Sequence, residues 1–249
     1  MKKIFFIVCS ILLVSCNDQN ANNCFQTAGD IIQQEVEVAT FEKVVVHARI
    51  ELIITQGDEQ KVLIETGENL LNDITAEVIN NELILKNNNT CNFVRAYDLT
   101  KVYITVPNLT KIRNASEKNI YSNGLLTYNS LELVSIGDED VYLPIGDWHL
   151  NIQNENIRIS SNGNAIFYLE GTTTNLNINL FDFCDSRFEG EHLIAQHIKI
   201  NQISSNDMLI YPVESLSGAI YATGDVISFN KPTTVNVDDL SDYAELIFK

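Results

Sequence analysis

The chain has 249 residues, of which 16 are Lys or Arg and 33 are Asp or Glu, so its formal net charge at pH 7 is −17. Such an acidic chain repels phosphate backbones, which argues against nucleic acid as a partner. It also argues against a polyanionic substrate unless cations are bound between the two.

Residues 1–15 are typical of a secretory signal. Lys2 and Lys3 form a basic start, and the apolar run that follows is too short to span a bilayer as a stable helix. The Leu-Val-Ser-Cys sequence that ends at Cys16 resembles a bacterial lipobox, which implies cleavage before Cys16 and acylation of this residue. An ordinary secretory signal, in which Cys16 is incidental, is the alternative. We therefore expect a cell-envelope protein that lipid on Cys16 anchors to the outer membrane, on its surface or periplasmic face.

Cleavage would leave residues 16–249 with a net charge near −19, since two lysines leave with the signal. Residues 16–27 are polar and without periodicity, and we interpret them as the lipidated N-terminus and a flexible tether. The length that remains is enough for one large β domain or two small ones.

Residues 28–111 alternate polar and apolar side chains at period two, which predicts strands. β-Branched and aromatic residues dominate, and Asn, Asp and Gly mark the breaks. There is no convincing amphipathic helix, and Gly67–Ile74 predicts at most a short turn. We expect this half to be more sheet-like than the rest.

Residues 112–249 are repetitive. Short strand pairs recur, each with a polar turn of Ser, Asn, Gly or Asp before an apolar-x-apolar triplet. Triplets at Phe188, Met208, Val226 and Ala244 are 20, 18 and 18 residues apart, which is about one turn of a β-solenoid. The pattern predicts an all-β protein whose parallel rungs share a continuous core. An antiparallel sandwich, which also has short, regularly spaced strands, is the alternative.

One corner of this repeat contains three consecutive acids, Asp138, Glu139 and Asp140. Because similar polar corners recur along the chain, we interpret these acids as a turn rather than as a site. Adjacent side chains of an extended stretch also diverge, so they could not all reach one ion. Calcium at such a corner stays an alternative. The four His residues are scattered and no Cys-x-x-Cys is present, so neither a zinc site nor another cofactor is predicted.

Two stretches carry a resemblance to a known family. The stretch "FEKVVVHARIELIITQGDEQKVLIE" and the later "HIKINQISSNDMLIYPVESLSGAIYATGDVISFN" are similar to the putative auto-transporter adhesin family, also called the head GIN domain. The resemblance extends over one domain, residues 28–249. It implies a right-handed parallel β-helix-like fold with short irregular strands, an envelope location and an adhesive role, and it implies no catalytic residues. The corners "SSND" and "ATGD" depart from the family by losing glycines, a loss that Asn tolerates better than most residues.

Three cysteines remain after Cys16, in a compartment where one disulfide and one free thiol are the simplest arrangement. Three pairings are possible. Cys24 and Cys91 lie in the two segments that do not resemble the repeat, and we interpret them as a disulfide that pins the N-terminal segment to the strands. Cys184 is then a small core residue, and a disulfide through Cys184 is the alternative.

The segment after Cys91 also allows a functional interpretation. At period two Phe93, Arg95 and Tyr97 would share one face, and Tyr and Arg are typical of binding hot spots. On the solenoid itself, five aromatic residues could stack on sugars, although Trp148 fits the core better because Leu150 and Ile152 continue its period. The five are Tyr142, Trp148, Tyr168, Tyr211 and Tyr221.

The sequence therefore favours a non-enzymatic adhesin that binds envelope or host polysaccharide, or another protein, through its β-helix face. The alternative is a carbohydrate-active enzyme, either a glycoside hydrolase or a lyase. Hydrolysis needs two carboxylates about 5 to 9 Å apart, for which Asp138 with Asp140 or Asp225 are the candidates. A lyase needs a base, and Lys and Arg are sparse here. A structural or sensor role has no support from particular residues.

Overall fold

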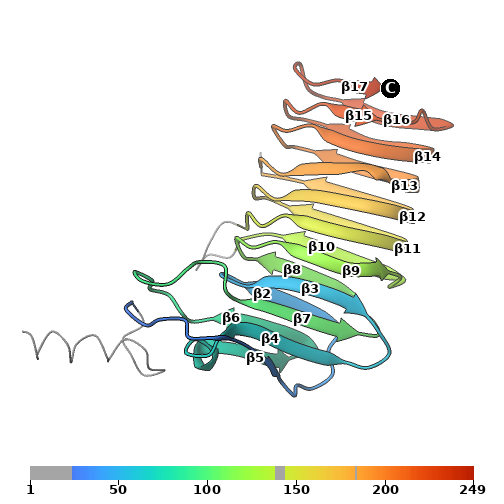
Figure 1. Cartoon of the computed structure of the whole chain (residues 1–249). Helices are drawn as coiled ribbons and strands as arrows, with labels where there is room; N and C mark the ends of the chain where they lie inside the picture. The colour runs from blue at the N-terminus through green and yellow to red at the C-terminus, as the bar shows by residue number, and fades with distance from the viewer. Residues whose placement is uncertain (1–23, 138–143, 183) are drawn as a thin grey trace, which may run out of the picture.

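The computed structural model describes residues 24–137, 144–182 and 184–249. Over these residues the chain is all-β, and its only helix is one turn of 3₁₀ helix, η1 (Leu71–Asp73). Hydrogen bonds join the described strands into one curled sheet of seventeen strands (Figure 1). The strands are β1 (Ile31–Glu35), β2 (Lys43–His47), β3 (Glu51–Gln56), β4 (Lys61–Gly67), β5 (Ile74–Ile79), β6 (Glu82–Asn87), β7 (Lys101–Val106), β8 (Lys111–Ala115), β9 (Ile120–Leu126), β10 (Ser130–Ser135), β11 (Trp148–Ser161), β12 (Ile166–Leu180), β13 (Arg187–Gln202), β14 (Met208–Ile220), β15 (Val226–Ser228), β16 (Thr234–Asp239) and β17 (Leu246–Phe248). No helix in this part of the chain is long and apolar enough to cross a membrane.

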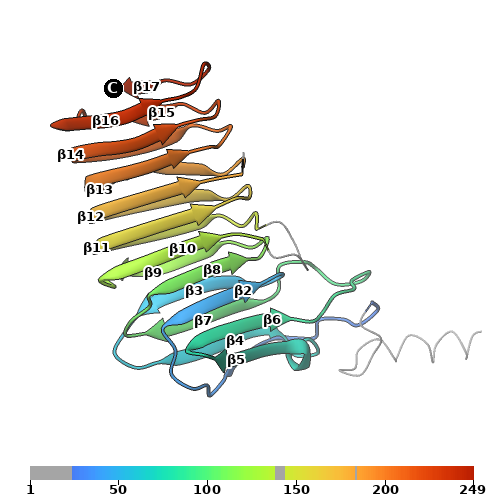
Figure 2. The same ribbon diagram turned by 180° about the vertical axis from the view of Figure 1, so that it is seen from behind.

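Strands β8–β17, called the strand stack below, pair in parallel. Each of β11, β12 and β13 pairs with the strand that follows it in the sequence (Figure 2). Trp148 lies opposite Phe167, which lies opposite Phe188, so these partners are 19 and 21 residues apart. This parallel pairing excludes the antiparallel sandwich for the second half of the chain.

The period expected from the triplets is correct for its first two steps and wrong for the third. Phe188 pairs with Met208, and Met208 pairs with Val226. The partner of Val226 is Leu246, however, and Ala244 lies buried in the corner before it. The last corner is therefore longer than the spacing of apolar residues suggests.

The first half of the chain contains the antiparallel pairs. Among the described strands these are β1 with β4, β4 with β7, and β5 with β6. A two-residue turn joins β5 to β6, and its residues Asn80 and Asn81 have φ values of 52° and 65°, as this type of hairpin requires. Strands β2 and β3 pair in parallel with β8 and β9, so this half continues directly into the strand stack.

The long strands of the stack bend around the core. In β12 the buried positions are Phe167 and Leu169 before the bend and Leu176 and Ile178 after it, so the inward phase changes from odd to even residues. Gly171 lies between these pairs with φ +111°, and a Cβ there would lie 2.1 Å from a backbone oxygen of β11. One long strand therefore presents side chains to the core from two directions.

Aromatic side chains occupy the centre of this core. Trp148, Phe167 and Phe188 are fully buried, and the rings of Trp148 and Phe167 stack with centroids 5.5 Å apart. Burial of Trp148 confirms the prediction that it belongs to the core. Cys184 is also buried and its thiol is free, as expected.

Buried amide side chains hold the corners between turns of the stack. Asn114 donates a hydrogen bond from Nδ2 to the carbonyl oxygen of Gly146 (3.2 Å). Gln202 makes the same connection further along, from Nε2 to the carbonyl oxygens of Asn206 (2.8 Å) and Gly224 (3.3 Å). The corners stack so closely that a Cβ on Gly224 would lie 2.0 Å from the Asn206 oxygen. The bonds to Gly146 and Gly224 are buried, so each amide satisfies a carbonyl group inside the protein.

Serine hydroxyls have the same function in the intervening corners. Ser161 and Ser186, both fully buried, share a hydrogen bond of 2.6 Å. Ser186 also contacts the Gly163 carbonyl oxygen (2.9 Å), and Ser204 donates to the carbonyl oxygen of Ser186 (2.6 Å). Ser161, Ser186 and Ser204 are therefore buried structural residues rather than solvated turn residues.

Acidic residues at the described corners accept backbone hydrogen bonds from the next turn. The carboxylate of Asp147 accepts from the amide of Ile166 (3.0 Å), and that of Asp207 accepts from the amide of Asp225 (3.0 Å). Asp225 in turn accepts from the amide of Glu245 (2.9 Å). A carboxylate used in this way links consecutive turns, which supports a turn role for acidic corners.

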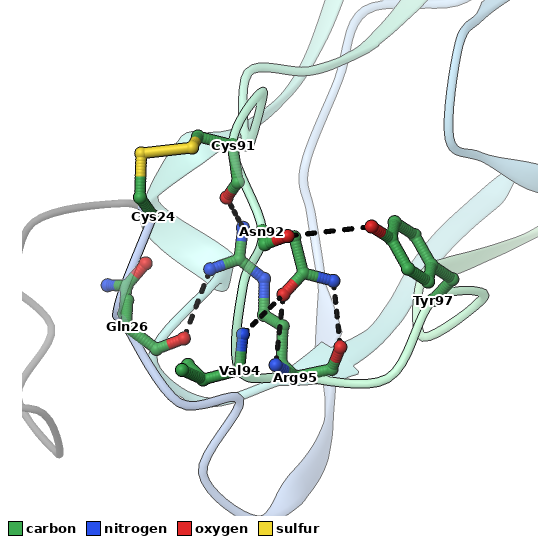
Figure 3. The surroundings of a disulfide bond; sticks show 7 residues. All are labelled: Cys24, Gln26, Cys91, Asn92, Val94, Arg95 and Tyr97. Carbon is green, nitrogen blue, oxygen red and sulfur yellow. Dashed lines mark hydrogen bonds between the residues drawn. A yellow bond between two sulfur atoms is a disulfide. The ribbon is translucent and has the colours of Figure 1, made fainter.

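A disulfide joins Cys24 to Cys91, which is the pairing favoured from the sequence (Figure 3). The two residues are 67 positions apart, so the bond connects the first described residue to the loop after β6. The amide of Phe93 donates to the Cys24 carbonyl oxygen (2.9 Å), which adds a second connection at the same place.

We predict that Phe167→Ala destabilises the protein by about 3–5 kcal/mol, because it leaves a cavity in the aromatic centre of the core. Tyr168→Ala is the matched control, since Tyr168 is 40% exposed and stacks only on the outer face. Its expected cost is about 1 kcal/mol. Urea denaturation measures both, and equal losses would contradict the inward placement of Phe167.

We predict that reduction of the disulfide destabilises the protein by about 4 kcal/mol, the chain-entropy value for a loop of this length. The melting temperature of Cys184→Ala should fall on addition of reductant, as for the unsubstituted protein. The Cys24→Ser/Cys91→Ser variant should melt lower and be indifferent to reductant. Loss of reductant sensitivity in Cys184→Ala would show that the wrong pair has been assigned.

Candidate ligand-binding surfaces

A groove of about 450 Å³ crosses the outer face of β10–β14, and we call it the polar groove because most of the residues that line it have polar side chains. Its floor includes Leu131, Ile157 and Leu176, whose side chains point into the core and are 2% exposed. The floor is therefore mainly backbone, and the walls are the outward-facing residues on either side. Parallel pairing places these residues in two columns, one residue from each strand.

The first column is bonded within itself. The side-chain amide of Asn156 donates from Nδ2 to Ser130 Oγ (3.0 Å), and that of Asn175 donates from Nδ2 to Asn156 Oδ1 (3.0 Å). One strand further, His197 Nδ1 lies 3.0 Å from Ser215 Oγ. These side chains form a fixed wall of amide, imidazole and hydroxyl groups.

The second column carries free cationic and amide groups. Its members in register are Glu132, Arg158, Asn177 and Lys199, and Glu132 forms an ion pair with Lys111 (3.4 Å). Within the described residues, the side chains of Arg158, Asn177 and Lys199 have no hydrogen bond or ion pair. Arg158 and Lys199 lie two strands apart, about 10 Å at the usual strand spacing. They can therefore donate to a ligand in the groove.

A second hollow lies beside a column of stacked rings on the other outer face. His149 lies between Tyr121 and Tyr168, with centroid distances of 4.9 and 4.8 Å and 11° between the planes in each pair. His149 therefore has both ring faces covered, and Tyr168 has one face covered by His149. Tyr168 is 40% exposed, but only its other face could stack on a sugar.

Carboxylates complete this second hollow. Glu170, Glu189 and Glu191 line it, and Glu189 forms an ion pair with Arg187. Burial raises the pKa of the Glu189 carboxyl, because removal from water disfavours the charged form, although the positive charge of Arg187 opposes the shift. Among the described residues, no three His, Cys, Asp or Glu side chains are grouped so that they could hold a metal ion.

The third surface is the disulfide knob, which we define as residues 24–27 and 91–97. Phe93 and Tyr97 are 73% and 74% exposed, but Arg95 points inward (Figure 3). The Arg95 guanidinium donates to the carbonyl oxygens of Gln26 (3.1 Å) and Cys91 (2.8 Å). Burial lowers the pKa of Arg95, and the negative charge of Asp73 partly offsets this effect.

The expectation that Phe93, Arg95 and Tyr97 share one face is therefore wrong. The segment is a series of bends rather than a strand, so period two does not apply. The side chain of Asn92 fixes these bends, since its Oδ1 accepts hydrogen bonds from the amides of Val94 (3.2 Å) and Arg95 (2.9 Å). Arg95 is a structural residue of the knob.

Other candidate residues are distributed over the molecule. Tyr211 is half-buried and Tyr221 is 45% exposed, and they are not part of the polar groove. Cys16, Tyr142 and the acids Asp138, Glu139 and Asp140 lie outside the described residues. Sequence reasoning missed the cations of the groove, because only the register shows that Arg158 and Lys199 lie in one column.

Comparison with known proteins gives a family and a fold. The model of the family described as putative auto-transporter adhesin, head GIN domain, matches residues 40–232. Comparison with curated proteins gives no match.

Several solved structures are similar to the chain. A crystal structure of a putative adhesin from Bacteroides fragilis has a TM-score of 0.78 at 18% identity, covering 90% of this chain and 99% of that one. A putative lipid binding protein from Parabacteroides distasonis has a TM-score of 0.58 at 13% identity, covering 88% and 97%. A putative adhesin from Parabacteroides merdae has the same values. At these identities the likeness shows a shared fold.

The names of the family and of these structures are consistent with a non-enzymatic adhesin of the cell envelope or surface. The family model matches well over half of the chain, and it does so across both the first half and most of the strand stack. The protein belongs to the putative auto-transporter adhesin, head GIN domain family.

Proposed function

We propose that the protein is a non-enzymatic, lipid-anchored adhesin that binds polysaccharide in the polar groove of β10–β14. The observation that carries this proposal is the groove itself, whose donors and acceptors repeat from strand to strand. Five strands at a spacing of about 4.8 Å span about 19 Å, which suits an elongated ligand rather than a small molecule.

The strand stack, on this proposal, is a right-handed parallel β-solenoid. Its support is the parallel pairing of consecutive strands at intervals of 18 to 21 residues, together with bends that keep one core continuous. Parallel strands joined by crossover connections are almost always right-handed. A solenoid displays repeated columns of outward side chains, and such columns match a ligand that is itself a repeating chain.

The chemistry of the groove suits a largely neutral glycan. The amide and hydroxyl groups of the first column can exchange hydrogen bonds with sugar hydroxyls. Arg158 and Lys199 have no partner within the described residues, so their donors are available to the ligand. The net charge of the chain opposes a long polyanion, so any acid group of the ligand is expected at isolated positions beside these two cations.

The residues of the groove favour binding over glycoside hydrolysis. Hydrolysis requires two carboxylates within about 10 Å. Glu132 is the only described carboxylate that lines the groove, and it is paired with Lys111. Glu214, on β14, lies beside His197. It is four strands from Glu132 on β10, a separation of about 19 Å.

Attachment to the envelope rests on Cys16. The lipobox-like sequence before this residue supports acylation. Each CH₂ group of an acyl chain that is buried in a bilayer stabilises the anchor by roughly 0.8 kcal/mol. The family to which the chain belongs is named for adhesins, which is consistent with an envelope location. The anchor would hold the groove close to the polysaccharide of the same envelope or of a host surface.

We predict that Arg158→Gln/Lys199→Gln weakens binding on a glycan array at least tenfold, because hydrogen bonds to charged groups contribute about 1.5–3 kcal/mol each. Lys86→Gln/Lys231→Gln is the matched control, with the same change in charge at exposed positions outside the groove. Binding should occur without release of oligosaccharide. Equal loss in both double variants would contradict a site in the groove, and released product would contradict a non-enzymatic role.

We predict that Cys16→Ala abolishes metabolic labelling with a radioactive fatty acid and leaves the protein out of the membrane fraction. Cys184→Ala, the control, should be labelled normally, since its thiol is buried. Labelling of Cys16→Ala would show that the lipid is attached elsewhere.

A further inference from the structure

The disulfide knob carries apolar side chains that are exposed in the described part of the protein. Phe25 and Val94 are each 52% exposed, and Phe93 and Tyr97 are still more so, at 73% and 74%. The Phe25 and Phe93 rings lie with centroids 5.6 Å apart, so they form one patch across the two segments. Exposed apolar residues in contact with each other indicate an interaction surface rather than scattered surface residues.

The knob is rigid in spite of its irregular backbone. The disulfide, the two Arg95 hydrogen bonds and the Asn92 side chain all connect backbone segments of the knob. Gln26, which is 1% exposed, ties the knob to the body by donating to the carbonyl oxygen of Asn69 (2.8 Å). A surface that is already ordered loses little conformational entropy when it binds.

The position of the knob in the chain points to the membrane as its binding partner. Cys24 is eight residues after Cys16, and eight residues span at most about 29 Å when fully extended. The knob is therefore the part of the described protein that a lipid on Cys16 holds nearest to the bilayer. Tyr and Trp side chains are enriched at the membrane–water interface, and Phe is common on the apolar face of segments that lie in it.

We propose that the disulfide knob inserts Phe93 and Phe25, together with the exposed Val94 and Tyr97, into the interfacial layer of the membrane that carries the acylated Cys16. This inference rests on the proposed lipid anchor. The knob then provides a second contact with the bilayer, which fixes the orientation of the protein where a flexible tether alone would leave it free to rotate. Burial of these side chains strengthens the anchor in proportion to their apolar area.

The test uses the acylated protein, residues 16–249, bound to phosphatidylcholine vesicles that contain brominated acyl chains. In the Phe93→Trp variant, the new indole should be quenched at least twofold and its emission should shift to shorter wavelength. Tyr243→Trp is the matched control, because Tyr243 is 81% exposed but lies near the C-terminus, at the opposite end of the strand stack (Figure 1). The unsubstituted protein gives the background from Trp148, which is fully buried.

Each outcome supports or overturns the inference. Quenching at position 93 and not at position 243, with unchanged circular dichroism, supports insertion of the knob. Vesicle flotation without quenching at position 93 overturns it and leaves the patch facing a protein partner. Equal quenching at both positions also overturns it. Failure of the unsubstituted protein to float overturns the lipid anchor together with this inference, whereas glycan binding in the groove is measured separately and is unaffected.

Discussion

The structure depends on satisfying the backbone at its stacked corners. Parallel strands at a spacing of about 4.8 Å bring each corner onto the one before it, so carbonyl groups at the corners are closed off from water. An unpaired buried carbonyl costs free energy comparable to a lost hydrogen bond. Asn114, Gln202 and the serines between them supply the missing donors from inside the molecule. The aromatic core can be continuous only because these corners close.

The same register that builds the core also builds the outer surface. When Trp148 lies opposite Phe167, the residues that face outward are necessarily aligned as well. The polar groove and the stacked rings of Tyr121, His149 and Tyr168 are two products of this alignment. They differ in what they can bind, because the rings stack on one another, whereas the donors of Arg158 and Lys199 have no partner among the described residues. The chemistry of such a surface depends on which residue types recur from strand to strand, rather than on one group of catalytic residues.

Much of the fold could be predicted from the sequence, but little of the binding surface could. Alternation at period two reports burial directly, so the strands, the inward Trp148 and the repeat of Phe188, Met208 and Val226 were recognisable. The prediction that Ala244 is the partner of Val226 was wrong, because Ala244 and Leu246 are both apolar. Only the hydrogen-bond register shows that Leu246 is in the strand and Ala244 in the corner. For Phe93, Arg95 and Tyr97 the assumption of a strand failed, because Asn92 bends the backbone through hydrogen bonds that no spacing reveals. Arg158 and Lys199 are 41 residues apart, and no local pattern relates them.

The link from each corner carboxylate to the amide of the next turn has an evolutionary consequence. The carboxylate of Asp207 accepts from the amide of Asp225, and that of Asp225 accepts from the amide of Glu245, so these corners are completed by their immediate neighbours. A whole turn of about twenty residues can then be gained or lost in a gene without leaving any corner incomplete. The number of turns, and with it the length of the outer face, can in this sense vary without any change in how each turn closes on the one before it. Proteins built in this way can extend their outer columns of side chains by duplication of a turn, without a new arrangement of the core.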